Sequence, residues 1–270
     1  MPVELSVALS SVARLSALAV AVHSVEDLHL HVRHGRDPAW RWSLLRADHR
    51  SGPRVVLAGL DLALGGGRFT WILAARLLCA LGALFVFHPA LQGTLVVCTA
   101  LIAIRWRGVF NGGSDGMILL VLIALAVASV NTDSAVLVRA CLWYIAIQGV
   151  CSYFVAGIVK LRNPEWRSGR ALALFLRTPG IALDRGDLRH PGRAGALFVL
   201  TNVSAVFALS WFVLIFECLF PLMLLFPSLC VPWISAAVTF HLGVFYMFGL
   251  NRFVLAWLPV YPALYYCIVL

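Results

Sequence analysis

The feature that most constrains this chain is a series of long apolar runs that recurs from one end of the sequence to the other. Hydrophobic residues make up 61% of the chain, charged residues only 12%, and the mean hydropathy is +0.91. Soluble globular domains carry about 25% charged residues. We therefore expect residues 1–270 to form one integral membrane domain rather than a set of soluble domains.

The length of the runs predicts the fold class. A helix needs about 20 mostly apolar residues to cross the hydrocarbon core. Backbone polar groups in lipid must be paired internally, and the runs lack the period-two alternation of a barrel strand. We predict an all-α transmembrane bundle of about eight spans. The expected spans are 5–23, 71–88, 93–104, 116–131, 135–161 and 195–217, with two or three more after Pro221.

One apolar segment is too short to cross a membrane. It reads VVLAGLDLALGGG at residues 55–67 and ends in three consecutive glycines. We expect this segment to lie in the membrane interface or to re-enter the membrane.

Arginines are concentrated in loops between the predicted spans. The loops at 32–68 and 162–193 hold seven arginines each, and Arg105 and Arg107 mark a third basic loop. The turns HPALQ and NTDS hold none. Counting spans places the basic loops on one side, which the positive-inside rule makes cytoplasmic. We expect a bacterial plasma membrane protein whose net charge of +9 meets anionic lipid rather than nucleic acid.

Lys160, near the end of the run at 135–161, is the only lysine among 21 lysines and arginines. Steps of four and three residues back from it lead to Ala156, Tyr153 and Gly149, with Gln148 beside them, so this face is predicted to point into the bundle. Snorkelling towards the headgroups is one interpretation, although arginine would serve equally well. Lysine, unlike arginine, can become a neutral base in an apolar environment. Lys160 is therefore a candidate catalytic base.

Further polar groups lie in or beside the apolar runs. In FNGGSDGM, Asn111 precedes a tight loop, and Asp115 would begin the next span, where a carboxylate suits the helix dipole. Asp115 is then either a helix cap or a site residue near Lys160. Glu217 and His241 lie within apolar sequence, where ionisable groups are functional candidates by default. Hydrogen bonds that tie helices together are the alternative interpretation.

Four polar residues share one face of the helix that leaves the first span. His23, Asp27, His31 and His34 are spaced by four, four and three residues. Such a face can bind zinc or another transition metal. The pattern is not HExxH, so a solvated face is favoured and we assign no metal site.

The stretch QGVCSYFVAGIVKLRNPEW resembles the signature of the membrane domain of vitamin K-dependent gamma-carboxylases. Wider bacterial relatives form the horizontally transferred transmembrane (HTTM) family, including the sporulation-delaying protein B (SdpB) type, which acts in peptide toxin maturation. The NGGSDG loop, the segment from Glu217 to Pro221, and FH followed by GLNRFVLAWLPVYPALYY occur in the same order. The resemblance covers roughly residues 105–270.

The resemblance implies roles for individual residues. Lys160 falls on the base that deprotonates a vitamin K hydroquinone, and His241 on a second functional histidine. Asp115 is the ionisable group nearest to a family histidine that this chain lacks. The implied cofactor is a reduced quinone of the menaquinol or vitamin K hydroquinone type. The residues that would bind it are Asn111, Gln148, Tyr153, Gly157, Trp166 and Glu217.

Three functions remain open on the sequence. The first is a quinol-using membrane enzyme, a carboxylase/epoxidase-like lyase or an oxidoreductase, that acts on a peptide or small substrate with Lys160 as base. The second is a non-catalytic membrane factor for maturation or export of a secreted peptide. The third is a transporter, suggested by Asp115, Arg139, Glu217 and His241, although no inverted repeat supports it.

Overall fold

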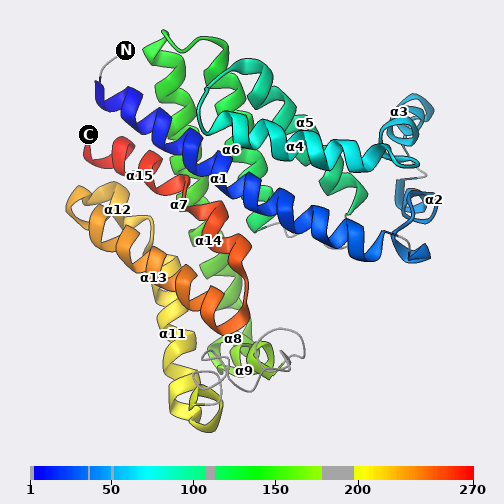
Figure 1. The fold of residues 1–270 in the computed structure, drawn as a ribbon. Helices are drawn as coiled ribbons and strands as arrows, with labels where there is room; N and C mark the ends of the chain where they lie inside the picture. The colour runs from blue at the N-terminus through cyan, green and yellow to red at the C-terminus, as the bar shows by residue number, and fades with distance from the viewer. Residues whose placement is uncertain (1–2, 36, 50–51, 107–112, 178–197) are drawn as a thin grey trace. The chain divides into compact units, whose positions relative to one another are not determined.

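The computed structural model describes residues 3–35, 37–49, 52–106, 113–177 and 198–270. Within these ranges the chain consists of α-helices and short 3-10 helices, with no β-strand. The all-α prediction is therefore confirmed. Figure 1 shows the helices in chain order.

The chain divides into two compact units. Unit 1 comprises Met1–Ile145 with Leu255–Pro262, and unit 2 comprises Ala146–Val254 with Ala263–Leu270. Three helices contribute residues to both units: α7 (Ala135–Arg162), α14 (Asn251–Trp257) and α15 (Val260–Val269).

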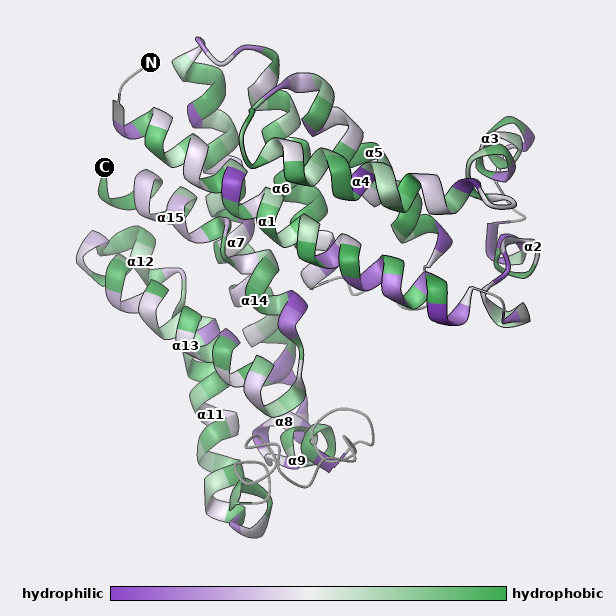
Figure 2. Cartoon of the chain, in the orientation of Figure 1, coloured by the Kyte–Doolittle hydropathy of each residue, from purple (hydrophilic) through white to green (hydrophobic). Residues whose placement is uncertain are grey.

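Several helices are long and apolar enough to cross a membrane. Among the described residues five meet this condition, at Glu4–His34, Ala135–Arg162, Val203–Leu225, Pro227–Phe248 and Asn251–Val269. A bent pair, α3 (Arg54–Leu64) and α4 (Arg68–Ala83), would add a sixth if it formed one span. The expected count of about eight is not confirmed. The long apolar helices are compatible with an integral membrane protein (Figure 2).

Besides α4, which has 16 residues, two expected spans form helices that are shorter than a typical span. These are α5 (Pro89–Arg105) and α6 (Ser114–Val130), with 17 residues each. At 1.5 Å per residue each is about 25 Å long, compared with a hydrocarbon core of about 30 Å. Their length, rather than their hydropathy, therefore separates them from the five longer segments.

Unit 1 is built on four helices that pack in sequence. Helix α1 (Val3–His34) packs against α4, α4 against α5, and α5 against α6 (Figure 1). Helix α1 continues well past residue 23, where the sequence predicted the first span to end. Short elements follow it: η1 (Pro38–Trp40), α2 (Trp42–Leu45), η2 (Arg46–His49) and then α3.

A buried ion pair joins α1 to α4. Arg76 of α4 contacts the Asp27 carboxylate through Nη2, and its Nε donates a hydrogen bond of 2.9 Å to Ser24 Oγ. The side chains of Arg76 and Asp27 are 5% and 3% exposed. Asp27 therefore lies inside the helix pair rather than on a solvated histidine face. Its pairing with Arg76 allows α1 to carry a carboxylate through the apolar interior of unit 1.

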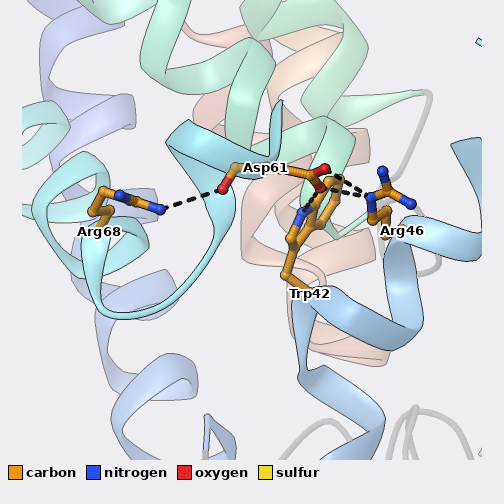
Figure 3. Close-up of polar contacts among 4 residues, drawn as sticks. All are labelled: Trp42, Arg46, Asp61 and Arg68. Carbon is orange, nitrogen blue, oxygen red and sulfur yellow. Dashed lines mark hydrogen bonds and ion pairs between the residues drawn. The ribbon is translucent and has the colours of Figure 1, made fainter. Parts of the chain in front are cut away.

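A polar clamp holds α2 and η2 to α3. The Asp61 carboxylate of α3 accepts hydrogen bonds from Trp42 Nε1 at 2.8 Å and from Arg46 Nε at 2.7 and 2.9 Å (Figure 3). On its other side, Arg68 Nη2 lies 3.5 Å from the Asp61 carbonyl oxygen. The Trp42 ring is buried in an apolar cluster with Leu64, Phe69, Leu73, Ile102 and Trp106. The clamp and the cluster together fix α3 against the rest of unit 1.

Arg105 secures the C-terminal end of α3. It donates hydrogen bonds to the carbonyl oxygens of Leu64 and, at 3.2 Å, of Trp40. Its guanidinium carbon lies 4.2 Å from the centroid of the Phe69 ring. The last carbonyls of a helix lack intrahelical partners, so a buried arginine at this place satisfies backbone that would otherwise be costly to bury.

We expect the clamp to withstand mild acid. The hydrogen bond from Arg46, aided by the one from Trp42, lowers the pKa of Asp61 below its ordinary 3.8. A carboxyl whose pKa is lower in the folded state stabilises the fold above its unfolded pKa, and this contribution is lost as the pH falls through the folded pKa. The small difference in melting temperature between the wild type and Asp61→Asn should stay constant from pH 7 to about 5 and vanish only below about 4.

Thermal unfolding in detergent across this pH range measures that difference. Glu165→Gln, which removes an exposed pair with Arg170 in unit 2, is the matched control. A difference that already shrinks near pH 6 would show that Asp61 is not held as an ionised group by Arg46.

Unit 2 contains the second half of α7, α8 (Pro164–Arg167), α9 (Arg170–Arg177), α11 (Val203–Leu219), α12 (Leu222–Leu225), η3 (Pro227–Leu229) and α13 (Cys230–Phe248). Asparagines cap two of these helices: the Asn163 side chain accepts a hydrogen bond from the Glu165 amide, and the Asn202 side chain from the Ala205 amide. Helix α13 ends at Gly249, whose φ of 69° belongs to the left-handed region.

Candidate active site in unit 2

One face of α7 turns into unit 2. Tyr153 and Gly157 are buried and Lys160 is half-buried, whereas Val155 and Val159 are exposed. The inward residues are spaced by four and three positions, and the two exposed valines by four, as expected for two faces of one helix. The inward face is the one that the sequence spacing predicted.

The amine of Lys160 is directed at a carboxylate on α11. Its Nζ donates hydrogen bonds to both carboxylate oxygens of Glu217, at 2.6 Å to Oε2. The side chains of Lys160 and Glu217 are 21% and 4% exposed. The same Nζ lies 5.2 Å from the centroid of the Trp166 ring, within the range of a cation–π contact. Lys160 is therefore held at an interior ion pair.

Gly157 allows the backbones of α7 and α11 to approach closely at this pair. A Cβ on Gly157 would lie 2.7 Å from the backbone nitrogen of Cys218 and 2.9 Å from the carbonyl carbon of Glu217. Atoms of a real side chain do not fit at such distances. The missing side chain thus brings the Glu217 segment within reach of Lys160, which lies less than one helical turn further along α7.

A second hydrogen-bonded pair lies between α7 and α13. The Tyr153 hydroxyl and His241 Nε2 are 2.7 Å apart, and both residues are buried. Phe220 stacks on the Tyr153 ring with centroids 3.9 Å apart, and Phe253 stacks on the His241 ring at 6.2 Å. The hydrogen-bonded tyrosine and histidine therefore lie in largely aromatic surroundings, in which polar interactions are stronger than in water.

The two pairs lie near each other along α7. Phe216, next to Glu217 in the chain, packs edge-on against the Tyr153 ring, with ring centroids 5.7 Å apart. A proton that moves from the lysine ammonium to the Glu217 carboxylate leaves a neutral amine beside a neutral acid, with no net charge added to the apolar interior. The cluster can therefore supply the neutral amine that general-base chemistry requires.

The remaining predicted site residues are distributed along the chain. Gln148 is half-buried on α7, and Trp166 in α8 lies against Lys160 as described. Asp115 belongs to unit 1, where it occupies the first turn of α6, as predicted for a carboxylate at a helix start. Asn111 lies outside the described residues.

The histidines of α1 take part in helix contacts. His31 Nε2 lies 3.0 Å from Thr70 Oγ1, and the His34 ring stacks on Trp40 with centroids 6.2 Å apart. No group of three or more histidine, cysteine, aspartate or glutamate side chains in the described parts of the chain could hold a metal ion. Asp27, from the same sequence pattern, is paired with Arg76.

Sequence reasoning named Lys160, Glu217, Tyr153 and His241 as site residues but predicted neither of the two pairs that they form. Lys160 with Glu217 and Tyr153 with His241 join different helices, so helical spacing cannot reveal them. Arg76 was not singled out at all. The sequence did contain one signal that such pairs exist. An ionisable group in an apolar run is energetically costly to bury alone, so each one needs a partner on another helix.

The resemblance of residues 105–270 to the HTTM family rests on the sequence motifs alone. No protein-family model, curated protein or solved structure matches this chain.

Proposed function

We propose that the chain is a membrane enzyme in which Lys160 acts as a general base. The observation that carries the proposal is the ion pair between the only lysine of the chain and the buried Glu217 carboxylate. An arginine could form the same pair, but it could not give up its proton. The sequence therefore carries, at this interior position, the one basic residue type that can cycle between an ammonium and a free amine.

Glu217 is the group that prepares the base. Both of its oxygens contact Lys160 Nζ, so it orients the amine and can accept its proton. The neutral Lys160 amine then takes a proton from an acidic hydroxyl of the substrate. Trp166, which lies against the amine, favours the ammonium that forms at this step. Glu217 must then release the proton that it took from Lys160, to the product or to water, before it can pair again as a carboxylate with the new ammonium and reset the site.

A reduced quinone of the menaquinol or vitamin K hydroquinone type fits the donor set of this cluster. Tyr153 with His241, and Lys160 with Glu217, offer donors and acceptors for ring hydroxyls. The nearby phenylalanine rings suit an apolar ring system. When bound, such a quinol would supply an acidic hydroxyl and reducing electrons for chemistry on a peptide or small substrate.

The proposal places the chain in a bacterial plasma membrane with its arginine-rich loops towards the cytoplasm. The support is the charge distribution: the loops at 32–68 and 162–193 hold seven arginines each, and the turns HPALQ and NTDS hold none. In this orientation the C-terminal end of α7, with Lys160, lies near the cytoplasmic side.

The experiment compares Lys160→Arg and Lys160→Ala in the native host, with the reaction product or phenotype as output. Both variants should lose activity by about 10²- to 10⁴-fold, because neither provides a deprotonatable amine. Membrane levels of both proteins should match the wild type. Arg162→Ala, which removes an exposed cation two residues further along α7, should retain full activity.

Retention of activity by Lys160→Arg would contradict the proposal. It would support the second candidate function, a non-catalytic factor for maturation or export of a secreted peptide. The close contact of Gly157 with the α11 backbone is compatible with that candidate, in which the ion pair would serve only to tie α7 to α11. In that case bulk at position 157 would abolish the output while arginine at position 160 would not.

A further inference from the structure

We propose that α3 is an interfacial helix that docks on an anionic phospholipid surface. Its apolar exposed face would enter the outer part of the acyl region, and arginines at its two ends would bind lipid phosphates. The inference shares with the proposed function only the membrane location of the chain. It does not involve Lys160 or its neighbours.

The length and direction of α3 suit a position in the membrane plane. Its 11 residues form a rod of about 16 Å, too short for a hydrocarbon core of about 30 Å. The helix meets α4 at 76°, and α4 packs along α1, a candidate span. Between the two helices Gly66 has a φ of 59°, which permits the sharp turn. A helix nearly perpendicular to the spanning direction lies along the interface.

One face of α3 packs against the protein and the opposite face is exposed. Leu57 and Leu64 are buried, and between them the Asp61 side chain is held by the clamp with Trp42 and Arg46 (Figure 3). On the opposite face Val55 is 84% exposed and Leu62 65% exposed. They are seven residues apart, two helical turns, and Ala58 and Gly59 between them are also exposed. A rigidly held helix thus presents an apolar stripe outward.

Cations flank this stripe at both ends. Arg54 begins α3 and Arg68 follows the glycine turn, and both are exposed. The Arg46 charge is matched by Asp61, so Arg54 and Arg68 supply the net positive charge beside the stripe. Guanidinium groups bind phosphate well and are drawn to the anionic lipid of the cytoplasmic leaflet. An apolar stripe between arginines is the pattern of an interfacial helix.

A second copy of the chain fits the exposed face of α3 less well than an anionic lipid surface does. Two α3 helices that met through this stripe would bring the Arg54 and Arg68 groups of both copies into one interface. Like charges placed together oppose association. An anionic lipid surface instead complements both the stripe and its flanking cations.

Photo-crosslinking of the full chain in proteoliposomes tests the inference. The photoreactive residue p-benzoylphenylalanine replaces Leu62 or Val55, and the vesicles contain equal parts of phosphatidylcholine and phosphatidylglycerol. We expect phospholipid adducts in intact mass spectra, with phosphatidylglycerol favoured by about fivefold for each arginine. The same label at Leu60, which packs against the buried cluster, should give only crosslinks within the chain.

Two further variants separate the parts of the inference. In Arg54→Gln/Arg68→Gln the preference for phosphatidylglycerol should fall to about one, whereas Arg170→Gln in unit 2 should leave it unchanged. An unchanged preference in the double variant overturns the headgroup contact. Crosslinked dimers from Leu62, or an absence of lipid adducts there, overturn the docking.

A label at Leu18, an exposed residue of the candidate span α1, reports membrane insertion separately. Lipid adducts at Leu18 without adducts at Val55 and Leu62 overturn the inference and leave the membrane location intact. An absence of adducts at Leu18 as well overturns the membrane location itself. The Lys160 variants do not affect any of these readings.

Discussion

Replacing Asp27 with leucine should destabilise unit 1 by about 3–5 kcal/mol, because the buried Arg76 guanidinium loses its carboxylate. The guanidinium cannot shed its proton to become neutral. Arg76→Leu should destabilise less, since the Asp27 carboxyl that remains can take up a proton. The two single variants are therefore expected to be unequal, with the loss of the acid the worse.

The double variant Asp27→Leu/Arg76→Leu should recover most of the stability. Replacing both members of a buried ion pair by apolar side chains is often neutral or stabilising. Unfolding in mixed micelles, followed by far-UV circular dichroism, gives the free energies for the cycle. Glu165→Leu, which breaks an exposed pair, serves as the control and should change little. A double variant as unstable as Asp27→Leu would show that the pair does more than neutralise charge.

Gly157→Ala should destabilise unit 2 by about 1–3 kcal/mol, and Gly157→Leu by more. The added Cβ would lie 2.7 Å from the Cys218 backbone nitrogen, so α7 and α11 must separate. Because Glu217 precedes Cys218 directly, the separation also pulls its carboxylate from Lys160. Under the proposed function both activity and stability should fall.

Gly243→Ala is the matched control for Gly157. Gly243 lies in α13 of the same unit, and a Cβ there would meet no atom within 4 Å. That substitution should be neutral or stabilise by up to about 1 kcal/mol, since alanine favours a helix over glycine. Thermal unfolding of the three variants in one detergent measures the contrast. Equal stability of Gly157→Ala and Gly243→Ala would contradict the close approach of α7 and α11.

Hydropathy predicted the helices better than their ends. The run expected at 135–161 is α7, at Ala135–Arg162. The first span was expected at 5–23, with the helix that carries His23 to His34 leaving it, and α1 joins both stretches in one helix that ends at His34. Arg76 of α4 bonds Ser24 and Asp27 where the two stretches meet. Such a partner lies 49 positions or more along the chain and cannot be seen by local hydropathy.

For the candidate site, the sequence likewise predicted properties of single helices but not the contacts between helices. Helical spacing indicated that Lys160 and Tyr153 share an inward face, because that property belongs to one helix. It could not show that Glu217 on α11 and His241 on α13 are their partners. The role of Gly157 was equally hidden, since the sequence shows a small residue and only the neighbouring backbone explains why it must be small.

The pairing of one lysine with one carboxylate makes the protein simple to observe by spectroscopy. Reductive methylation with isotopically labelled formaldehyde can modify no other side-chain amine, because the sequence contains no other lysine. The chemical shift of the resulting methyl groups depends on whether the nitrogen carries a proton. A single side-chain resonance would thus report the charge of the Lys160–Glu217 pair directly, in the intact chain and in the presence of lipid.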